Sequence, residues 1–310
     1  MKIVLFGGSG FLGRRLIPKL LSKVHTVILV SRRPELVGRN IVPFVDVKEW
    51  STPEKLASVI DGTDAVINLT GESIGTMRWS DARKKKLLAS RIETTRSIVE
   101  AIGRTSRKPS VLLNASAVGY YGNVENDNVT ENHPPGNDFL ADLCVRWEAE
   151  ASKAEPMGVR VVLPRTGIVL AKDGGALQRM LIPFRMFVGG PLGSGKQWFP
   201  WIHIDDEIDA MIYALEHSEI SGPINLVAPE SVTMRRFCFT LGKTMHRPSW
   251  APVPAFILKI ILGEMAESLV LGGQKVSSQK LIESGYQFKF SRIDEALAEI
   301  LGGYIGTFRR

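Results

Sequence analysis

Three glycines near the amino terminus are spaced in a way that could hold a phosphate-bearing cofactor. Gly7, Gly10 and Gly13 follow a short apolar run, residues 2–6, and open a helix-length segment. Glycines let the backbone turn tightly and approach a pyrophosphate, and a helix start offers free N–H groups and a positive dipole end. The alternative is a glycine-rich structural turn, but the preceding strand and following helix favour a dinucleotide site. The predicted contacts here are Gly7, Gly10, Phe11, Leu12 and Gly13.

The end of the second apolar run indicates which dinucleotide would bind. A free ribose 2′-hydroxyl is usually met by an acidic residue about 20 residues after the glycines. This run instead ends in Ser31, Arg32 and Arg33, and the first acid is Glu35. A hydroxyl beside guanidinium groups suits a 2′-phosphate, because arginine pairs with phosphate through two parallel hydrogen bonds. We therefore predict NADP(H) rather than NAD(H), against the alternative that both arginines are ordinary surface charges.

These residues need a scaffold that brings the ends of several strands together. Short runs rich in Val, Ile and Leu alternate with helix-length segments over the first half of the chain. Such runs are typical of strands buried on both faces, and the alternation predicts an α/β fold with a doubly wound parallel sheet. The predicted strands are 2–6, 26–31, 41–46, 65–69, 111–116 and 159–165. The predicted helices between them are 11–22, 53–60, 81–102 and 138–154.

The sequence changes character after residue 165, where glycine and proline become dense. We predict a cofactor domain over residues 1–165 and a smaller, irregular α/β substrate lobe over 166–310. Residues 206–227 are expected to return to the first domain. Later helices are predicted at 207–217, 234–245 and 292–301, with one more strand at 224–227. The basic run 83–86 on the helix 81–102 is interpreted as a solvated face.

Composition limits the classes of function. The chain has 310 residues, 44% hydrophobic and 23% charged, which excludes a disordered chain, a collagen or a disulfide miniprotein. A net charge of +7 is compatible with nucleic acid, an anionic surface or a phosphate-bearing ligand. Because no basic, aromatic-interleaved stretch and no bilayer-length apolar run occurs, we expect neither a nucleic-acid nor a membrane partner. Two cysteines and scattered histidines predict a cytoplasmic protein with reduced thiols and no metal site.

With these motifs in hand, the chain resembles the extended short-chain dehydrogenase/reductase superfamily, on its sugar-nucleotide epimerase side. The glycine spacing, residues 68–71, the serine-bearing loop 116–122 and the late segment 201–206 carry the resemblance, which covers nearly the whole chain. It implies a Rossmann-type fold and further cofactor contacts after successive strands. Those expected contacts are Asp46, Leu69, Thr70, Gly71, Ala115 and Pro164.

The sequence departs from the active extended enzymes at the catalytic helix. Those enzymes use a Tyr-x-x-x-Lys pair, but here Leu140 stands at the tyrosine position and Cys144 at the lysine position. This loss resembles an atypical subgroup called epimerase family proteins, whose relatives have also been called cell-division inhibitors. That subgroup commonly carries an arginine on the preceding long helix. The resemblance therefore implies that Arg91 contacts the cofactor.

Other residues must supply the chemistry if the protein turns over a substrate. Ser116 and Tyr121 are the candidate catalytic residues, with Tyr121 as the replacement acid. His203 is interpreted as holding the start of a late helix, with Asp205 or Asp206 as its N-cap. The segment 189–201 resembles a loop over the substrate pocket. Its candidate substrate contacts are Lys196, Gln197 and Trp198.

Two functions follow from this sequence. The first is an NADP(H)-dependent oxidoreductase or epimerase-like enzyme with a non-standard active site. Its substrate would be a small molecule, with sugar nucleotides and phosphorylated compounds as candidates. The alternative is an inactive NADP(H)-binding sensor or partner-binding module, with a link to cell division. A monomer and a homodimer are both compatible with the sequence.

Overall fold

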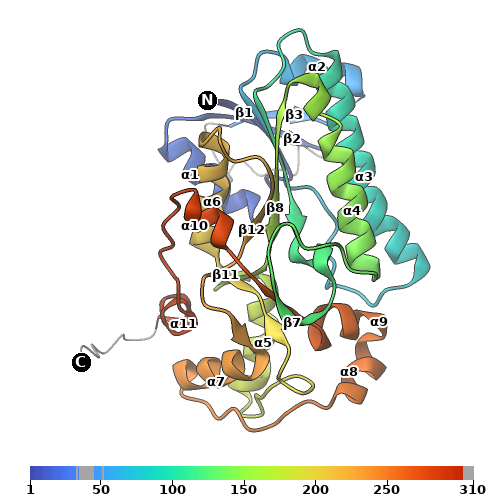
Figure 1. Cartoon of the computed structure of the whole chain (residues 1–310). Helices are drawn as coiled ribbons and strands as arrows, with labels where there is room; N and C mark the ends of the chain where they lie inside the picture. Colours follow the sequence, from blue (N-terminus) through green and yellow to red (C-terminus); the bar gives the residue numbers. More distant parts are fainter. Residues whose placement is uncertain (33, 35–44, 51, 303–310) are drawn as a thin grey trace.

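A parallel β-sheet with helices on both faces forms the larger part of the molecule (Figure 1). The computed structural model describes residues 1–32, 34, 45–50 and 52–302. The sheet order is β12-β8-β5-β4-β1-β2-β3, with the short β6 also paired to β8. The strands are β1 (Lys2–Phe6), β2 (Thr26–Ser31), β3 (Asp46–Glu49), β4 (Ala65–Asn68), β5 (Val111–Asn114), β6 (Ser116–Ala117), β8 (Arg160–Thr166) and β12 (Gly222–Leu226). The predicted doubly wound parallel sheet is confirmed.

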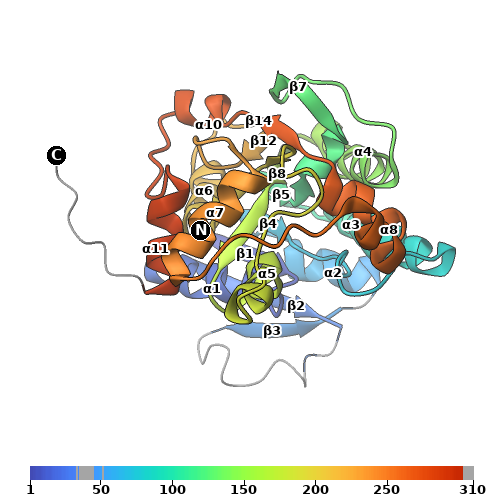
Figure 2. The ribbon, with the colours of Figure 1, turned by 90° about the horizontal axis from the view of Figure 1, so that it is seen from below.

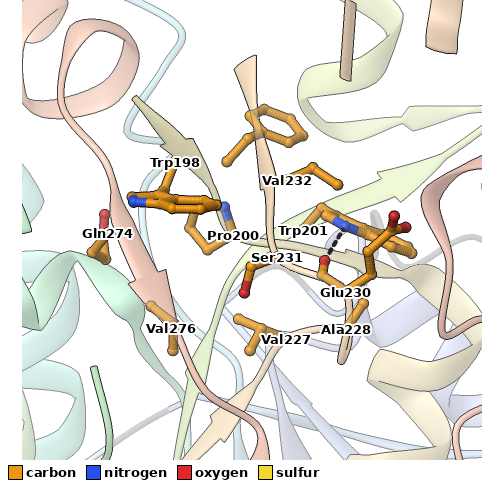
Figure 3. A pocket seen from close by; sticks show the side chains of 11 residues that line it. Trp198, Pro200, Trp201, Val227, Ala228, Glu230, Ser231, Val232, Gln274 and Val276 are labelled. Carbon is orange, nitrogen blue, oxygen red and sulfur yellow. Dashed lines mark hydrogen bonds between the residues drawn. The ribbon is translucent and has the colours of Figure 1, made fainter. Parts of the chain in front are cut away.

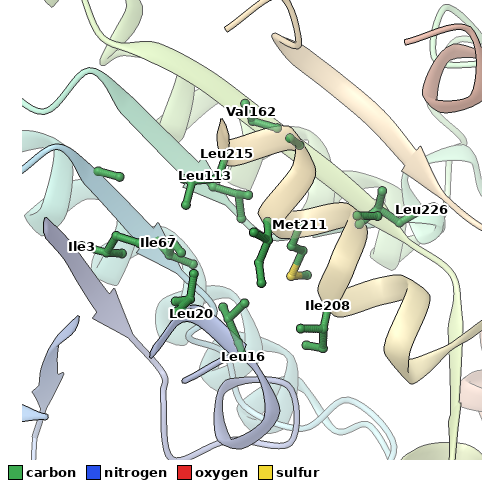
Figure 4. Packing of buried hydrophobic residues seen from close by; sticks show 14 of the residues in the cluster. Ile3, Leu16, Leu20, Ile67, Leu113, Val162, Ile208, Met211, Leu215 and Leu226 are labelled. Atoms are coloured by element: carbon green, nitrogen blue, oxygen red, sulfur yellow. The ribbon is translucent and has the colours of Figure 1, made fainter. Parts of the chain in front are cut away.

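Alternation along each strand divides the apolar core between the two faces of this sheet. Ile3 and Leu5 of β1 point into one core, and Val4 and Phe6 point into the other. Figure 4 shows the first core, where the sheet packs against Leu16 and Leu20 of one helix and Met211 of another. A strand with both faces buried must be apolar at nearly every position, which is why these runs were recognisable in the sequence.

The helices lie in two layers. One face is covered by α2 (Pro53–Ile60), α3 (Asp81–Arg104) and α4 (Phe139–Ser152), and the other by α1 (Gly13–Ser22) and α6 (Ile204–Glu216) (Figure 1). Pro53 begins α2, where its missing N–H costs nothing. Ser80 caps α3 and Asp138 caps α4, each accepting a hydrogen bond from a backbone N–H three residues on.

A lobe of short strands and helices lies beyond the carboxyl ends of the main strands (Figures 1 and 2). Two-stranded pairings join β9 to β11, β10 to β13 and β7 to β14. The strands here are β7 (Val124–Val129), β9 (Ile168–Ala171), β10 (Trp198–Phe199), β11 (Trp201–His203), β13 (Val232–Thr233) and β14 (Gln274–Val276). The helices of the lobe are α5 (Gly175–Arg185), α7 (Met234–Met245), α8 (Ala255–Leu262), α9 (Glu264–Ala266) and α11 (Ile293–Leu301), while α10 (Gln279–Glu283) packs beside β12 of the main sheet. Single turns are η2 (Val118–Tyr121), η3 (Glu155–Met157) and η4 (Glu267–Leu271).

The chain leaves the main sheet after β8 and then returns to it. β12 pairs in parallel with β8, and α6 packs on the face that also holds α1. The predicted strand 41–46 differs from the structure: residues 41–44 lie outside the described part, and β3 begins at Asp46. No helix was predicted over residues 175–185, where α5 lies, because the segment contains Pro183 and follows a pair of glycines.

Candidate functional site

Two adjoining hollows lie at the carboxyl edge of the sheet, between the glycine loop and the lobe. The larger has a volume of about 920 Å³ and the smaller about 600 Å³, and both are lined by Gly7, Gly71 and Glu72. On the sheet side the larger hollow is also lined by Gly10, Phe11, Leu12, Gly13, Leu69, Ser73, Gly75, Arg91 and Ala115. Because β1 and β4 are neighbours, this is the crevice where open α/β sheets bind ligands.

The glycine loop has a backbone that other residues could not easily adopt. Gly7 has a φ of +82°, and a Cβ placed there would lie 2.8 Å from the carbonyl carbon of Leu69. A Cβ on Gly13 would lie 2.4 Å from the Cα of Gly8. Within the described chain no side chain caps the start of α1, whose N-cap is Leu12. The helix start therefore offers N–H groups to an anion, as the glycine spacing predicted.

Arg91 reaches the cleft from α3 and is 7% exposed. Its Nη2 donates to the carbonyl of Glu72 at 3.1 Å, and the guanidinium lies 5.1 Å from the ring centre of Trp147. Its buried Nε has no hydrogen-bond partner among the described residues. Burial lowers the pKa of Arg91 from its ordinary value, although charge is retained. An oxygen-rich ligand in the cleft would supply an acceptor that this cation lacks.

The smaller hollow gathers the residues predicted to select the cofactor. Ser31 and Arg32 line it at the end of β2, together with Thr70 after β4. Arg33 lies outside the described residues. Trp50, Lys86, Ser90 and Thr94 also line this hollow and were not predicted. Lys86, Ser90 and Thr94 are spaced four residues apart, so they share one face of α3. Lys86 ends the basic run 83–86 that was interpreted as a solvated face.

Two predicted cofactor contacts lie away from both hollows. Asp46 begins β3 opposite Ile28, at the amino end of the strand, and its carboxylate pairs with Lys48 at 3.0 Å. Pro164 is buried within β8 opposite Ile224 of β12. Neither is among the described residues that line the hollows. A strand places ligand contacts at its carboxyl end, so a residue at the start or middle of a strand is held back from the crevice.

The two predicted catalytic hydroxyls are also held away from the cleft. Ser116 Oγ donates to Glu148 Oε1 at 2.5 Å, and Tyr121 OH donates to Asn225 Oδ1 at 2.6 Å. Both side chains are buried, and neither belongs to the described lining of the hollows. Burial raises the pKa of Tyr121 to about 12, against the opposing charge of Arg165. At neutral pH this phenol keeps its proton.

Arg165 is the centre of the network that engages both hydroxyls. It is 3% exposed and holds Glu148 through two hydrogen bonds, from Nε at 2.9 Å and from Nη2 at 2.8 Å. Its Nη1 donates to Tyr121 OH and to the carbonyl of Glu131, both at 3.0 Å. Burial alone would lower the pKa of Arg165, but the Glu148 carboxylate outweighs it and the pKa lies above its ordinary value. No role had been predicted for Arg165 or Glu148.

Leu140 and Cys144, which the resemblance placed at the tyrosine and lysine positions, lie among apolar side chains. Leu140 is buried against Gly119, where an added Cβ would lie 3.3 Å from the Leu140 Cβ. Cys144 is buried in the same cluster as Trp79 and Leu87. Burial raises the pKa of the Cys144 thiol to about 12. Neither side chain is suited to transfer a proton near neutral pH.

The predicted substrate contacts 196–198 are not among the described residues that line the larger hollow. Gln197 Nε2 donates to the carbonyls of Leu192 and Val270, at 2.9 and 2.8 Å, and so ties two loops together. Trp198 lines a separate small hollow beside Trp201 (Figure 3). Lys196 is exposed, and its N–H donates to Ser194 Oγ. Side chains alternate along β10, so the neighbouring Phe199 lines the cleft instead of Trp198.

The late histidine has the structural role expected of it, with one correction. His203 itself is the N-cap of α6, because its Nδ1 accepts from the N–H of Asp205 at 3.1 Å. The prediction that Asp205 or Asp206 caps this helix was wrong. Asp206 is fully buried and accepts backbone hydrogen bonds from Lys289 and Phe290. It fixes the C-terminal segment to α6.

The described residues contain no cluster of three or more His, Cys, Asp or Glu side chains arranged to hold a metal ion. Cys144 and Cys238 are both free and buried. Among the described helices none is long and apolar enough to cross a bilayer.

Comparison with known proteins identifies the family of this chain. The model of the NAD dependent epimerase/dehydratase family matches residues 3–227. The chain belongs to this family. A second model, a domain of unknown function called DUF1731, matches residues 253–300 of this epimerase-family chain.

Relatives of similar length match nearly the whole chain. The epimerase family protein SDR39U1 homolog of Arabidopsis thaliana, a chloroplastic protein, is 42% identical over 97% of this chain and 87% of its own. The epimerase family protein YfhF of Bacillus subtilis is 38% identical over 97% of this chain and 98% of its own. A crystal structure of human epimerase family protein SDR39U1 with NADPH superposes with a TM-score of 0.86, at 34% identity over 97% of this chain and 99% of that one.

Proposed function

We propose that this protein binds NADP(H) in the two hollows, in preference to NAD(H). The observation that carries the proposal is the pairing of a helix-start anion site at Gly7–Gly13 with two cations at the other hollow, Arg32 and Lys86. Lys86 Nζ lies 3.5 Å from Glu72 Oε1 and is 63% exposed, so it can turn toward a phosphate at little cost. That a 34% identical human relative was solved with NADPH supports the same preference.

Different residues of the cleft would bind different parts of such a cofactor. The glycine loop would hold the pyrophosphate, and Ser31, Arg32 and Lys86 would hold the 2′-phosphate. Trp50 offers an aromatic face in the same hollow. Arg91 and Ala115 lie further along the larger hollow, where Arg91 would donate from its unpartnered Nε. When bound, the cofactor supplies hydride chemistry.

The proposed reaction is hydride exchange with a small substrate in the lobe-side part of the same cleft, as an oxidoreductase or an epimerase-like enzyme. Such a reaction needs an acid or base within reach of the substrate oxygen. Ser116 and Tyr121 were expected to serve, but their hydroxyls are engaged with Glu148 and Asn225. This engagement favours a second candidate, a protein that binds NADP(H) without turnover and reports its redox state.

Titration with NADPH and NADH tests cofactor choice. Arg32→Asp removes the guanidinium and adds an acid that suits a free 2′-hydroxyl. Hydrogen bonds to charged groups contribute about 1.5–3 kcal/mol, so the NADPH Kd is expected to rise roughly 10- to 100-fold while NADH binding holds or improves. Arg236→Asp on α7 is the matched control, since Arg236 is exposed and outside both hollows. Unchanged NADPH affinity in Arg32→Asp would refute the preference.

Turnover separates the two candidate functions. NADPH consumption is measured against aldehydes, ketones and sugar nucleotides, with Ser116→Ala and Tyr121→Phe in parallel. Turnover that both variants abolish supports the enzyme with those residues as its acid–base pair. Tight NADPH binding without turnover of any compound supports the sensor.

A further inference from the structure

The lobe-side half of the larger hollow is built almost wholly from apolar side chains. Met180 of α5, Leu192, Phe199 of β10, Met234 of α7 and Leu269 of η4 all line it. These residues come from separate parts of the lobe and converge on one space beyond the glycine loop. An interior surface of this kind binds ligands by burying their apolar area.

The segment 262–270 forms one wall of this half. Leu262, Met265, Leu269 and Val270 line the hollow, and all lie within the region matched by the domain of unknown function. The wall is fixed in place from outside. Gln197 donates to the carbonyl of Val270 at 2.8 Å, while Lys84 pairs with Glu264 across from α3. The apolar wall is therefore a built surface attached to both the lobe and the sheet domain.

Charge is nearly absent from this half. Among the described residues that line it, from Ile168 to Val270, Arg179 of α5 carries the only charge. Its Nη1 donates to the carbonyl of Gly75, which places the guanidinium between the lobe and the loop after β4. No carboxylate of the described lobe-side lining faces Arg179. A ligand with one anionic group would find a single cation at this end of an otherwise apolar space.

We propose that the lobe-side half of the cleft binds an elongated apolar molecule that carries one anionic group, such as a carboxylate, and that the segment 262–270 supplies its wall. This inference rests on the proposed function only in placing the ligand beside the cofactor. A sugar nucleotide fits poorly, because its hydroxyls and diphosphate would lose water without gaining hydrogen-bond partners from Met, Leu and Phe side chains. The three methionines, Met180, Met234 and Met265, give a wall that adapts to the shape of such a ligand.

Calorimetric titration of the NADPH-loaded protein with hexanoate, octanoate, decanoate and UDP-glucose tests the ligand class. Each buried methylene is worth about a four-fold change in affinity, so the carboxylate Kd is expected to fall in steps of that order as the chain lengthens. UDP-glucose is expected to bind more weakly than decanoate. Tighter binding of UDP-glucose, or carboxylate binding that does not depend on chain length, would overturn the proposal.

A pair of variants locates the binding to the cleft. Leu269→Gln places a polar group in the wall and is expected to weaken decanoate binding roughly ten-fold, with Leu269→Met restoring it. Ile260→Gln on α8 is the matched control, because Ile260 is 70% exposed and outside the lining. Equal weakening by Leu269→Gln and Ile260→Gln would place the probe on the outer surface and refute the assignment. Unaltered NADPH affinity in Leu269→Gln shows that the variant is folded.

The Arg32→Asp variant keeps this test independent of the cofactor proposal. Arg32 lies in the other hollow, so decanoate is expected to bind this variant even where NADPH does not. Decanoate binding without any NADPH binding, in the wild-type protein, would refute the proposed function and leave this inference standing. NADPH binding without decanoate binding would refute this inference and leave the proposed function standing. Arg179→Gln should weaken the binding of decanoate several-fold and leave the binding of 1-decanol unchanged. Equal effects on both compounds would show that Arg179 does not recognise an anionic group, and that part of the proposal would be refuted.

Discussion

The buried pair between Arg165 and Glu148 offers the sharpest test of how the centre of the molecule is held together. Glu148→Ala removes a carboxylate that accepts two hydrogen bonds from Arg165 and one from Ser116. The guanidinium is 3% exposed, so water cannot replace the lost partner. Breaking a buried pair from one side costs about 3–5 kcal/mol, and we expect Glu148→Ala to lower the free energy of unfolding by that amount.

The double variant Glu148→Leu/Arg165→Met shows how much of this loss comes from leaving one charge buried without its partner. With both charges gone, neither ion is left buried and unpaired, and apolar replacements of similar volume are often neutral. Arg165 also donates to Tyr121 and to the Glu131 carbonyl, and Ser116 donates to Glu148, so this variant still loses those three hydrogen bonds, about 1 kcal/mol each. We therefore expect the double variant to lose about 3 kcal/mol, no more than Glu148→Ala alone and well below the sum of the two single losses. The difference measures the coupling between the two residues.

Urea unfolding followed by tryptophan fluorescence measures these free energies, since the chain has six tryptophans. Glu155→Ala is the control, because Glu155 is an exposed acid in η3 and its loss changes the net charge equally. It is expected to shift the free energy of unfolding by less than about 0.5 kcal/mol. A loss below about 1 kcal/mol in Glu148→Ala, or a double variant that loses the sum of the single losses, would refute the account.

Two further perturbations test other buried polar groups. Tyr121→Phe removes a hydroxyl that donates to Asn225 and accepts from Arg165. The free energy of unfolding should therefore fall by about 1–2 kcal/mol, while the affinity for NADPH stays unchanged. A variant that keeps its stability but loses affinity for NADPH would instead place this hydroxyl at the cleft. Glu207 is fully buried, and burial raises its pKa from 4.5 to about 8 against the opposing hydrogen bond from Thr166. Because the folded carboxyl keeps a proton that the unfolded chain releases, wild-type stability should fall as pH rises between about 4.5 and 8. Glu207→Gln should therefore gain stability relative to wild type from pH 5 to pH 8, measured by unfolding at each pH, and an equal difference at both values would contradict the assignment.

The sheet could be read from the sequence because its signals are local. β1 and β4 are apolar at nearly every position, and their neighbours in the sheet follow from the alternation with helices. Gly7 and Gly13 were recognisable because the tight turn between β1 and α1 admits no other residue easily. β3 is an edge strand with exposed charged residues, so its start at Asp46 had no apolar signal.

The chemistry could not be read in the same way because it depends on contacts between distant residues. Nothing near Ser116 in the sequence shows that Glu148 and Arg165 will bury its hydroxyl. The segment 189–201 contains polar and aromatic residues that looked suited to a ligand, but along the two-residue strand β10 only Phe199 lines the cleft, while Trp198 lines the small separate hollow. The apolar wall from 262 to 270 is brought to the cleft only by the return of the chain.

The segment 168–200, which connects β8 to β11 and α6, has its two ends side by side. The N–H of Ile168 donates to the carbonyl of Pro200 at 2.6 Å, and the chain that leaves the sheet after Thr166 re-enters it at β12 directly beside β8. Residues 168–200 thus form a loop insertion in an otherwise continuous sheet, a kind of position where insertions are tolerated. A fragment cut at residue 165 would leave β8 as a bare edge, open to pairing with other copies. A graft that exchanges 168–200 and keeps 204–226 would preserve the sheet, so the ligand wall contributed by α5 and β10 can be re-engineered without rebuilding the cofactor domain.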